Sequence, residues 1–206
     1  VTLTLVAGGT LEEAAALGNA AAGVAVVQPG VVTVSNDELR DALATSGAPA
    51  KLKTTDTLQH ILDGLRKDGK RVVWTNGCFD IIHVGHITYL QRAAALGDVL
   101  VVGLNSDASV KQNKGPDRPI IPQENRAIVL AAFECVDYIV LFDEATPMKQ
   151  LEILKPDIYA KGGDYSIDTI VQEERRLVEG YGGQIAIISG VEGQSTTRIV
   201  RQMTGK

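Results

Sequence analysis

From residue 54 onward, the sequence alternates between short runs rich in Val and Ile and longer stretches in which apolar residues recur at helical spacing. This alternation is typical of a parallel β-sheet whose strands are connected by crossover helices. Strands are expected in five runs: 71–75, 99–104, 138–142, 158–160 and 185–188. The sequence therefore predicts an α/β fold with a Rossmann-like, open, parallel five-stranded sheet, in which ligands bind beyond the carboxyl ends of the strands.

Helix start and stop signals support this interpretation. The first expected helix begins at Thr54, carries a single apolar stripe and ends at Asp68-Gly69. Later helices are expected to begin at residues that favour a cap or a first turn, namely Pro122, Thr146-Pro147, and Ser195 or Thr196.

The first 45 residues follow a different pattern. Capping boxes, in which a side-chain oxygen is followed three residues later by Glu, begin at Thr10 and Ser35. Pro29-Gly30 marks a turn between Val-rich runs, and 46–50 interrupts the pattern. We therefore expect an N-terminal α/β appendage at 1–45, a linker at 46–53 and a main domain at 54–206.

Composition narrows the setting of the protein. The formal net charge is −5 and the 20 basic residues are scattered, which argues against nucleic acid as a main partner. Cys78 and Cys135 are the only cysteines and show no disulfide or zinc spacing. With no membrane-length apolar run and no signal peptide in view, a cytoplasmic protein without a membrane partner is expected. Because the chain begins at Val1, we expect a fragment or a processed product.

Two histidines follow the first expected strand. His83 and His86 are three residues apart at the start of a helix, so their rings are expected to share one face. Unpaired backbone N–H groups, the helix dipole and the close approach permitted by Gly85 favour a phosphate at this position. From the spacing alone, a structural role or a metal site stays open, although His60 is the only other histidine and belongs to a different helix.

Polar loops follow the second and fourth expected strands. The loop after the second strand begins with Asp107 and is basic, and it could clamp phosphates or form a solvated surface. The loop after the fourth strand holds two glycines between a lysine and an aspartate, and it could contact a ligand or form a simple turn. The residues concerned are Lys111, Lys114, Arg118 and Arg126 in the basic region, and Lys161, Gly162 and Asp164 in the second loop.

Hydroxyl side chains open the last expected helix. Ser195, Thr196 and Thr197 precede Arg198. Such residues cap a helix whatever its function, and the same geometry offers hydroxyls, N–H groups and a guanidinium to the outer phosphates of a nucleotide.

The segment 78–86 resembles the F-D-x-x-H-x-G-H signature of the cytidylyltransferase-like nucleotidyltransferases, and the stretch 193–198 resembles the second signature of that family. The resemblance implies a sheet of the nucleotidyltransferase type. It also implies that His83 and His86 contact nucleotide phosphates and stabilise charge at the reacting phosphorus.

The motifs T-N-G-C-F-D, N-S-D-A-S-V-K, K-G-x-x-R-P, K-G-G-D-Y and Q-S-T-T are similar to the adenylyltransferase half of bifunctional heptose 7-phosphate kinase/heptose 1-phosphate adenylyltransferases. This resemblance covers about residues 54–206. It implies transfer of AMP from ATP to D-glycero-β-D-manno-heptose 1-phosphate, which gives ADP-heptose for lipopolysaccharide core synthesis. Residues 1–45 resemble the carboxyl-terminal end of a ribokinase-type sugar kinase without its G-A-G-D segment, so kinase activity is not expected.

These considerations give a set of site predictions. The predicted catalytic residues are His83, His86, Lys114 and Arg198. Predicted ATP contacts are Thr75, Asn76, Gly77, Cys78, Phe79, Gly85, Asp107, Lys161, Gly162, Asp164, Ser195, Thr196 and Thr197. Predicted sugar-phosphate contacts are Lys111, Arg118 and Arg126, with Asp80 as a candidate Mg²⁺ contact.

Two alternatives stay open at this point. The same chemistry could serve another small phosphate, such as glycerol phosphate with CTP. In a different class of function, the chain would be a non-catalytic nucleotide-binding or assembly module. The expected partners are small molecules and further copies of the chain in a homo-oligomer.

Overall fold

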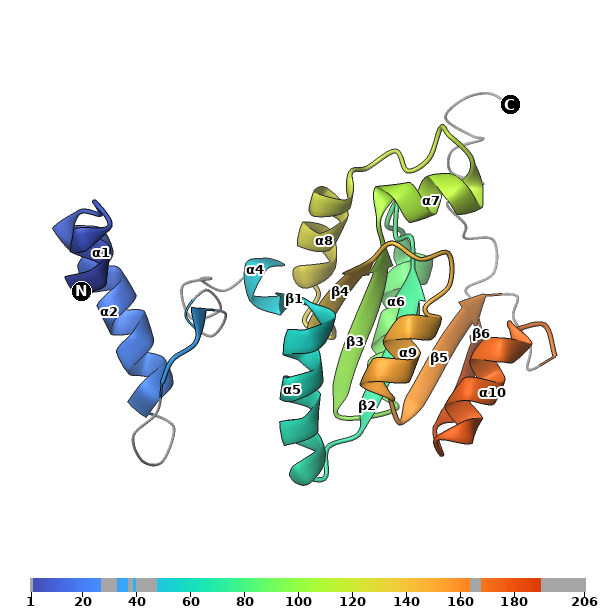
Figure 1. Ribbon diagram of the computed structural model, residues 1–206. Helices are drawn as coiled ribbons and strands as arrows, with labels where there is room; N and C mark the ends of the chain where they lie inside the picture. The colour runs from blue at the N-terminus through green and yellow to red at the C-terminus, as the bar shows by residue number, and fades with distance from the viewer. Residues whose placement is uncertain (1, 27–32, 37–38, 40–47, 164–167, 190–206) are drawn as a thin grey trace. The chain divides into compact units, whose positions relative to one another are not determined.

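The computed structural model describes residues 2–26, 33–36, 39, 48–163 and 168–189 (Figure 1). It comprises two compact units, Val1–Ala50 and Lys51–Lys206. Several predicted features lie outside the described residues: the Pro29-Gly30 turn, most of the helix expected after Ser35, Asp164, and the segment from Ser195 to Arg198.

The first unit contains α1 (Thr2–Val6) and α2 (Leu11–Val26), which contact each other. The predicted capping box at Thr10 lies directly before α2, where the Thr10 carbonyl accepts a hydrogen bond from the Ala14 amide at 3.0 Å. The helix predicted from that box is therefore present. At the second box, the Leu39 amide donates to the Ser35 carbonyl at 3.0 Å, which is the first helical turn expected there.

The second unit is built on a parallel sheet of six strands in the order β1-β4-β3-β2-β5-β6 (Figure 1). Its strands are β1 (Leu52–Lys53), β2 (Val72–Gly77), β3 (Val99–Asn105), β4 (Tyr138–Phe142), β5 (Ile158–Gly163) and β6 (Gln184–Ser189). All five predicted strands are present, so the predicted α/β class and parallel sheet are confirmed.

The predicted strand number was wrong by one. The additional strand, β1, pairs with β4 at the edge of the sheet and falls within the segment 46–53 that was expected to be a linker. The short helix α4 (Ala48–Lys51) precedes it. Two residues are too few to show the alternation of a strand in the sequence. They form a strand because they pair with Ile139 and Val140 of β4.

Helices cover both faces of the sheet (Figure 1). On one face lie α5 (Thr55–Lys67), α9 (Met148–Leu154) and α10 (Gln172–Gly180), and on the other lies α6 (Val84–Ala94). The remaining helices are α7 (Asp107–Lys114) and α8 (Gln123–Ala131), which contact β3 and β4. This two-sided cover explains why every residue of β3 is buried.

The boundaries of α5, α8 and α9 follow the predicted signals to within one residue, whereas α7 stands where a basic loop was expected. Thr54 caps α5, with its hydroxyl accepting from the Thr57 amide at 3.2 Å, and Asp68 ends it before Gly69 at φ +74°. Pro122 and Pro147 were expected in or at the first turn, but both stand as N-cap residues and their helices begin one position later. A shift of that size is within the usual variation of helix ends.

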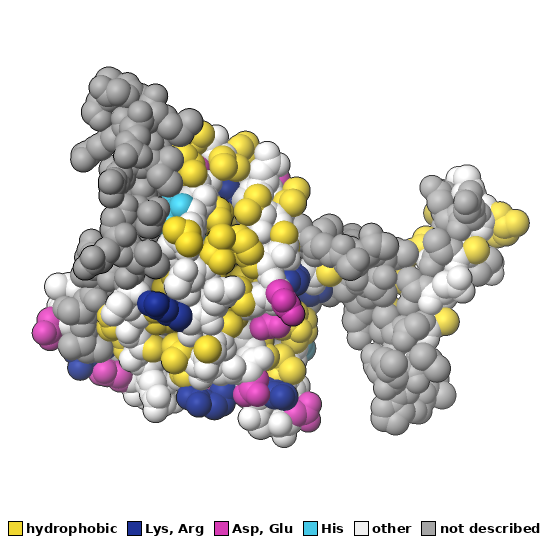
Figure 2. Space-filling view, turned by 180° about the vertical axis from the view of Figure 1, so that it is seen from behind, with side chains coloured by type: hydrophobic (Ala, Val, Ile, Leu, Met, Phe, Trp, Pro, Cys, Tyr) yellow, Lys and Arg dark blue, Asp and Glu magenta, His cyan; other side chains and the backbone are white. Residues whose placement is uncertain are grey.

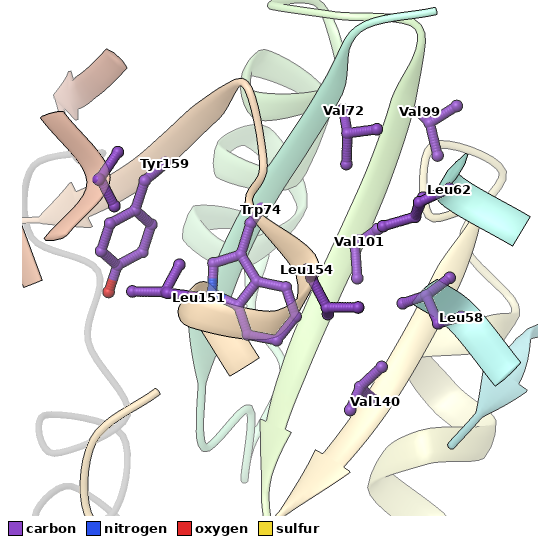
Figure 3. Packing of buried hydrophobic residues seen from close by; sticks show 11 residues of the cluster. Leu58, Leu62, Val72, Trp74, Val99, Val101, Val140, Leu151, Leu154 and Tyr159 are labelled. Carbon is purple, nitrogen blue, oxygen red and sulfur yellow. The ribbon is translucent and has the colours of Figure 1, made fainter. Parts of the chain in front are cut away.

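The core of the second unit lies under α5, α9 and α10 (Figure 3). Its central residue is Trp74, which is fully buried between β3 and α9. Gly103 makes room for the indole, because a Cβ at that position would lie 2.3 Å from the Trp74 ring. The cluster also contains Leu58, Leu62, Val72, Val99, Val101, Val140, Leu151, Leu154, Tyr159 and Val178.

Aspartates stabilise the amino-terminal edge of the sheet. Each stands directly before a strand and accepts a backbone N–H from the start of a neighbouring strand. The pairs are Asp98 with Arg71 N at 2.9 Å, Asp137 with Leu100 N at 2.7 Å and Asp157 with Val72 N at 2.8 Å. These carboxylates are occupied by backbone partners of the sheet.

The surface of the second unit mixes apolar and charged side chains. Figure 2 shows hydrophobic side chains spread over the face behind the view of Figure 1, with positive and negative side chains interspersed. Exposed large apolar residues include Ile128 and Val129 on α8. Within the described residues, no helix is both long and apolar enough to cross a membrane.

Candidate active site

The strand order reverses between β2 and β5, and in open α/β sheets ligands bind at the carboxyl edge beside such a reversal. β2 pairs with β3 as far as Gly77, whereas its pairing with β5 ends at Trp74 opposite Tyr159. β5 continues beyond that point in register with β6. The two strands therefore part beyond Trp74, which is the topological switch point where open α/β sheets bind ligands.

The two predicted histidines lie at this edge. His83 is the N-cap residue of α6, and its Nδ1 accepts a hydrogen bond from the Gly85 amide at 3.1 Å. The centroids of the His83 and His86 rings are 4.0 Å apart. The predicted proximity of the two rings is therefore confirmed, although His83 caps the helix rather than standing in its first turn.

Burial favours the uncharged form of both imidazoles. Burial lowers the pKa of His86 to about 4, and His83 and Lys114 lower it further by charge repulsion. Burial also lowers the pKa of His83. Because Nδ1 of His83 accepts a bond, the proton of its neutral ring is on Nε2, which is available as a donor.

The Nδ1 of His86 has no hydrogen-bond partner among the described residues, although it is buried. The Phe79 ring packs beside His86, with centroids 5.4 Å apart. Leaving a buried polar atom unpaired is costly, and such atoms in native proteins concentrate at functional sites. Chemically, the start of α6 thus combines two imidazoles with a positive helix end, a combination suited to a phosphate, although the Gly85 and His86 amides already donate to His83.

The chain leaves β2 through a tightly packed loop. Phe79 has φ +46°, and a Cβ at Gly77 would lie 3.1 Å from its ring, so the glycine accommodates the aromatic side chain. Cys78 is half-buried and turns its carbonyl oxygen toward Arg126. Inside β2, the Thr75 hydroxyl lies 2.6 Å from the Tyr89 hydroxyl.

Asp80 holds the loop before α8. Its carboxylate accepts from Arg118 Nε at 2.6 Å, from Ile120 N at 3.0 Å and from Ile121 N at 2.9 Å. Those hydrogen bonds and Arg118 hold the pKa of Asp80 below its usual value even though burial acts to raise it. Asp80 thus has the loop-holding contacts that were the alternative to a metal contact, and its role toward Mg²⁺ stays a prediction. Among the described residues, no group of three or more His, Cys, Asp or Glu is placed to hold a metal ion.

Arg126 was predicted to contact the sugar phosphate, and the structure gives it a different role. Its side chain is only 1% exposed. The guanidinium donates to the carbonyls of Cys78 and Ile121 and, at 2.7 Å, to Asp107. Arg126 therefore joins the loops after β2 and β3 to the start of α8, and Asp107 is its ion-pair partner.

Of the other basic candidates, one forms an ion pair within the protein and two are exposed to solvent. Arg118 is tied to Asp80. Lys111 and Lys114 are exposed at the carboxyl end of α7. Lys114 lies close enough to His86 to lower its pKa, so it is the basic candidate that the structure brings to the histidines.

Lys161 and Gly162 lie at the carboxyl end of β5. The Lys161 ammonium is 3.2 Å from the Glu174 carboxylate and 3.5 Å from Asn76 Oδ1. A Cβ at Gly162 would lie 2.4 Å from the Tyr89 ring, so this glycine makes room for a side chain of α6. The predicted reason for the glycine, close passage of a ligand, is not the one the structure provides.

Three residues in this region were not predicted: Tyr89, Tyr159 and Glu174. The Tyr89 hydroxyl donates to the Ala160 carbonyl at 3.0 Å and so links β2 to β5 where the strands part. Tyr89 stands three residues after His86, which was a usable signal. Glu174 gave no such signal, because it belongs to a run of charged residues that is typical of a solvated helix face.

A family model described as cytidylyltransferase-like matches residues 74–202. The chain belongs to the cytidylyltransferase-like family. The family resemblance predicted from the two signatures is therefore confirmed, and the matched range includes the carboxyl ends of β2 and β5 and both histidines.

Curated relatives match nearly the whole chain. The bifunctional protein HldE of Syntrophotalea carbinolica is 48% identical over 205 residues, which are 98% of this chain and 41% of that protein. The bifunctional protein HldE of Geobacter sulfurreducens is 47% identical over 203 residues, with coverage of 98% and 41%. The chain thus spans about two fifths of the length of these relatives, and the match includes the first unit.

Solved structures agree with the fold. The lipopolysaccharide core biosynthesis protein of Thermoplasma volcanium is 31% identical, with a TM-score of 0.50, and the match covers 61% of this chain and all of that one. The pantoate-β-alanine ligase of Francisella tularensis has a TM-score of 0.51 at 14% identity, covering 74% and 76% of the two chains. At that identity, the second likeness shows the fold alone.

Proposed function

We propose that the chain transfers AMP from ATP to D-glycero-β-D-manno-heptose 1-phosphate and releases pyrophosphate, with ADP-heptose as the product for lipopolysaccharide core synthesis. The observation that carries the proposal is the pair of imidazoles 4.0 Å apart at the start of α6, beside the switch point. The bifunctional relatives and the Thermoplasma volcanium protein named for lipopolysaccharide core biosynthesis support the choice of pathway.

In this reaction, an oxygen of the sugar phosphate attacks the α-phosphorus of ATP in line. One P–O bond forms, the bond from the α-phosphorus to the bridging oxygen breaks, and pyrophosphate leaves. No protein nucleophile is needed, because positioning and electrostatic stabilisation provide most of the catalysis in such transfers. His83 and His86 donate to phosphate oxygens as negative charge shifts toward the leaving group.

Basic and hydroxyl groups complete the proposed site. Lys114 neutralises charge on the triphosphate from its position near His86. We also assign phosphate contacts to Arg198 and to the hydroxyls of Ser195, Thr196 and Thr197, on the basis of the second family signature. Lys111 is proposed to contact the sugar phosphate, and Asp164 is proposed to contact ATP.

Magnesium is proposed as an ion carried by the triphosphate. Mg²⁺ prefers phosphate and water oxygens and needs few protein ligands. That preference fits this site, since the Asp80 carboxylate is occupied by protein donors. When bound, the ion would offset phosphate charge, and the residues of this chain orient the nucleotide.

Residues 1–45 are proposed to be the end of a ribokinase-type kinase domain. The expected linker at 46–53 is shortened at its end, because Leu52–Lys53 forms strand β1 of the sheet that belongs to the proposed transferase domain. The match of the bifunctional relatives over 98% of the chain supports this assignment. Kinase activity is not expected in the chain itself. We further propose that the protein works in the cytoplasm and self-associates, with Ile128 and Val129 as exposed apolar candidates for the contact.

Pyrophosphate release tests the proposal. Purified chain is incubated with Mg²⁺, with each nucleoside triphosphate in turn, and with a panel of phosphorylated acceptors that includes the heptose 1-phosphate and glycerol 3-phosphate. Release with ATP and the heptose phosphate alone supports the proposal. Release with CTP and glycerol phosphate would replace the substrates, and ATP binding without any release would favour a non-catalytic module.

A further inference from the structure

The switch-point strands are joined by side chains where their backbone pairing stops. Pairing between β2 and β5 ends at Trp74 and Tyr159, although β2 remains paired to β3 up to Gly77 and β5 to β6 up to Gly163. On the α6 face, the Tyr89 hydroxyl bridges the gap by contacting Thr75 and the Ala160 carbonyl. The opposite face of the same gap contains a second, charged bridge.

This second bridge consists of Asn76, Tyr159, Lys161 and Glu174. The Tyr159 hydroxyl lies 2.8 Å from Asn76 Oδ1 and 2.8 Å from Glu174 Oε2. The same carboxylate oxygen is 3.2 Å from the Lys161 ammonium. The ammonium also lies 4.8 Å from the centre of the Tyr159 ring, a favourable cation–π distance. Residues of β2, β5 and α10 thus hold one lysine at the switch point.

The bridge is buried, which makes its charges significant. Lys161 is 9% exposed and Glu174 is 2% exposed. Removing two charges from water has a large desolvation cost, and apolar residues of similar volume often fill such places with no loss of stability. An ion pair retained at the carboxyl edge of the switch point therefore indicates a role in binding rather than in folding.

We propose that Glu174 is a positioning residue of the nucleotidyl-transfer site, which holds Lys161 in place and in its charged form so that the lysine meets a phosphate oxygen of a bound substrate. The inference rests on the proposed function. Burial lowers the pKa of Lys161, and the charge of Glu174 acts in the opposite direction. A lysine without that carboxylate loses its proton at lower pH and with it the attraction for phosphate.

Two opposite outcomes are possible when the carboxylate charge is removed. If Glu174 only repelled the anionic substrate, its loss would tighten binding. If it positions and charges Lys161, its loss weakens binding, and more so as the pH rises. In the described part of the chain, the titratable groups facing the ammonium are Glu174 on α10 and Tyr159 on its own strand, with neutral Asn76 on β2.

The experiment compares Glu174→Gln with Glu173→Gln. Glu173 is the neighbouring, exposed glutamate of the same helix, so the control makes the same chemical change outside the bridge. Pyrophosphate release is measured for both substrates between about pH 7 and about pH 9. We expect Glu174→Gln to raise the KM of either ATP or the sugar phosphate about ten- to a hundredfold, because a charge-assisted hydrogen bond is lost. We also expect the decrease of kcat/KM at alkaline pH to begin at a lower pH. Glu173→Gln should match the wild-type chain.

A double variant separates binding from folding. Lys161→Met combined with Glu174→Leu removes both charges while keeping the volume, and its midpoint of unfolding should equal or exceed that of the wild-type chain, with activity still lost. With an active wild-type chain, three results would overturn the inference. These are an active double variant, an unchanged decrease of kcat/KM at alkaline pH in Glu174→Gln, and a lower KM in Glu174→Gln. A wild-type chain that releases no pyrophosphate with any acceptor would instead refute the proposed function.

Discussion

Replacing Arg126 with Met is expected to loosen the loops that frame the site and to destabilise the larger unit. The side chain is 1% exposed, and all three guanidinium nitrogens donate to protein oxygens. Met keeps most of the apolar volume but donates nothing. The carbonyls of Cys78 and Ile121 and the carboxylate of Asp107 would each lose a charged partner.

The size of the effect follows from these contacts. A hydrogen bond to a charged group contributes about 1.5–3 kcal/mol, and neighbouring bonds are not additive. We therefore expect the free energy of unfolding to fall by about 3–5 kcal/mol, close to the value for breaking a buried ion pair. In a domain of ordinary stability, this is a large share of the total.

The single tryptophan provides the assay. Trp74 is fully buried in the core of the second unit, so its fluorescence in a urea titration reports the unfolding of that unit. The midpoint should fall with little change in slope. Arg176→Met is a matched control, because Arg176 is an exposed arginine of α10, and it should change the stability by no more than about 0.5 kcal/mol. A wild-type midpoint combined with a raised KM would refute this reasoning and return Arg126 to the substrate contacts.

Three further outcomes are expected. His86→Ala should lower kcat by about 10²–10³-fold with the Trp74 fluorescence of a folded protein, and turnover at the wild-type rate would remove His86 from the mechanism. Burial lowers the pKa of His86 in the folded protein to about 4 from 6.5, so its contribution to stability is present above about pH 6.5 and is lost as the pH falls toward 4. In urea titrations over that range, the free energy of unfolding should therefore fall less steeply for His86→Gln than for the wild-type chain. Parallel curves would contradict this. Gly162→Ala should destabilise the second unit by about 1–3 kcal/mol, because the added Cβ would lie 2.4 Å from the Tyr89 ring. The control Gly64→Ala should be neutral or stabilising, because a Cβ there has nothing within 4 Å. Equal unfolding midpoints for the two variants would show that the Tyr89 ring moves freely.

Local patterns in the sequence were sufficient for the elements and for the start of the site. The alternation of strands and helices, the cap at Thr54 and the H-x-x-H spacing depend on residues close together in the chain, so the sheet and the pairing of His83 with His86 were predictable. The strand β1 was missed, because two residues carry no period of their own, and the helix α7 was missed, because its charged residues were interpreted as a loop.

The roles of the charged residues depended on contacts that sequence does not display. Arg126, Asp80 and Lys161 were all predicted to face ligands or a metal, and each has protein partners at least 13 positions away along the chain. Whether a charge faces a ligand or a protein group depends on which loops the fold brings together.

The sequence by itself determined the order of strands and helices, the family signature and the two imidazoles at one helix start, because each of these is encoded within a few consecutive residues. The tertiary structure alone decided that β2 and β5 part at Trp74 and that Lys161 is paired with Glu174 beside them. Those features arise from strand order and helix packing, which join residues that are remote in the chain and impose on their charges a common, buried environment.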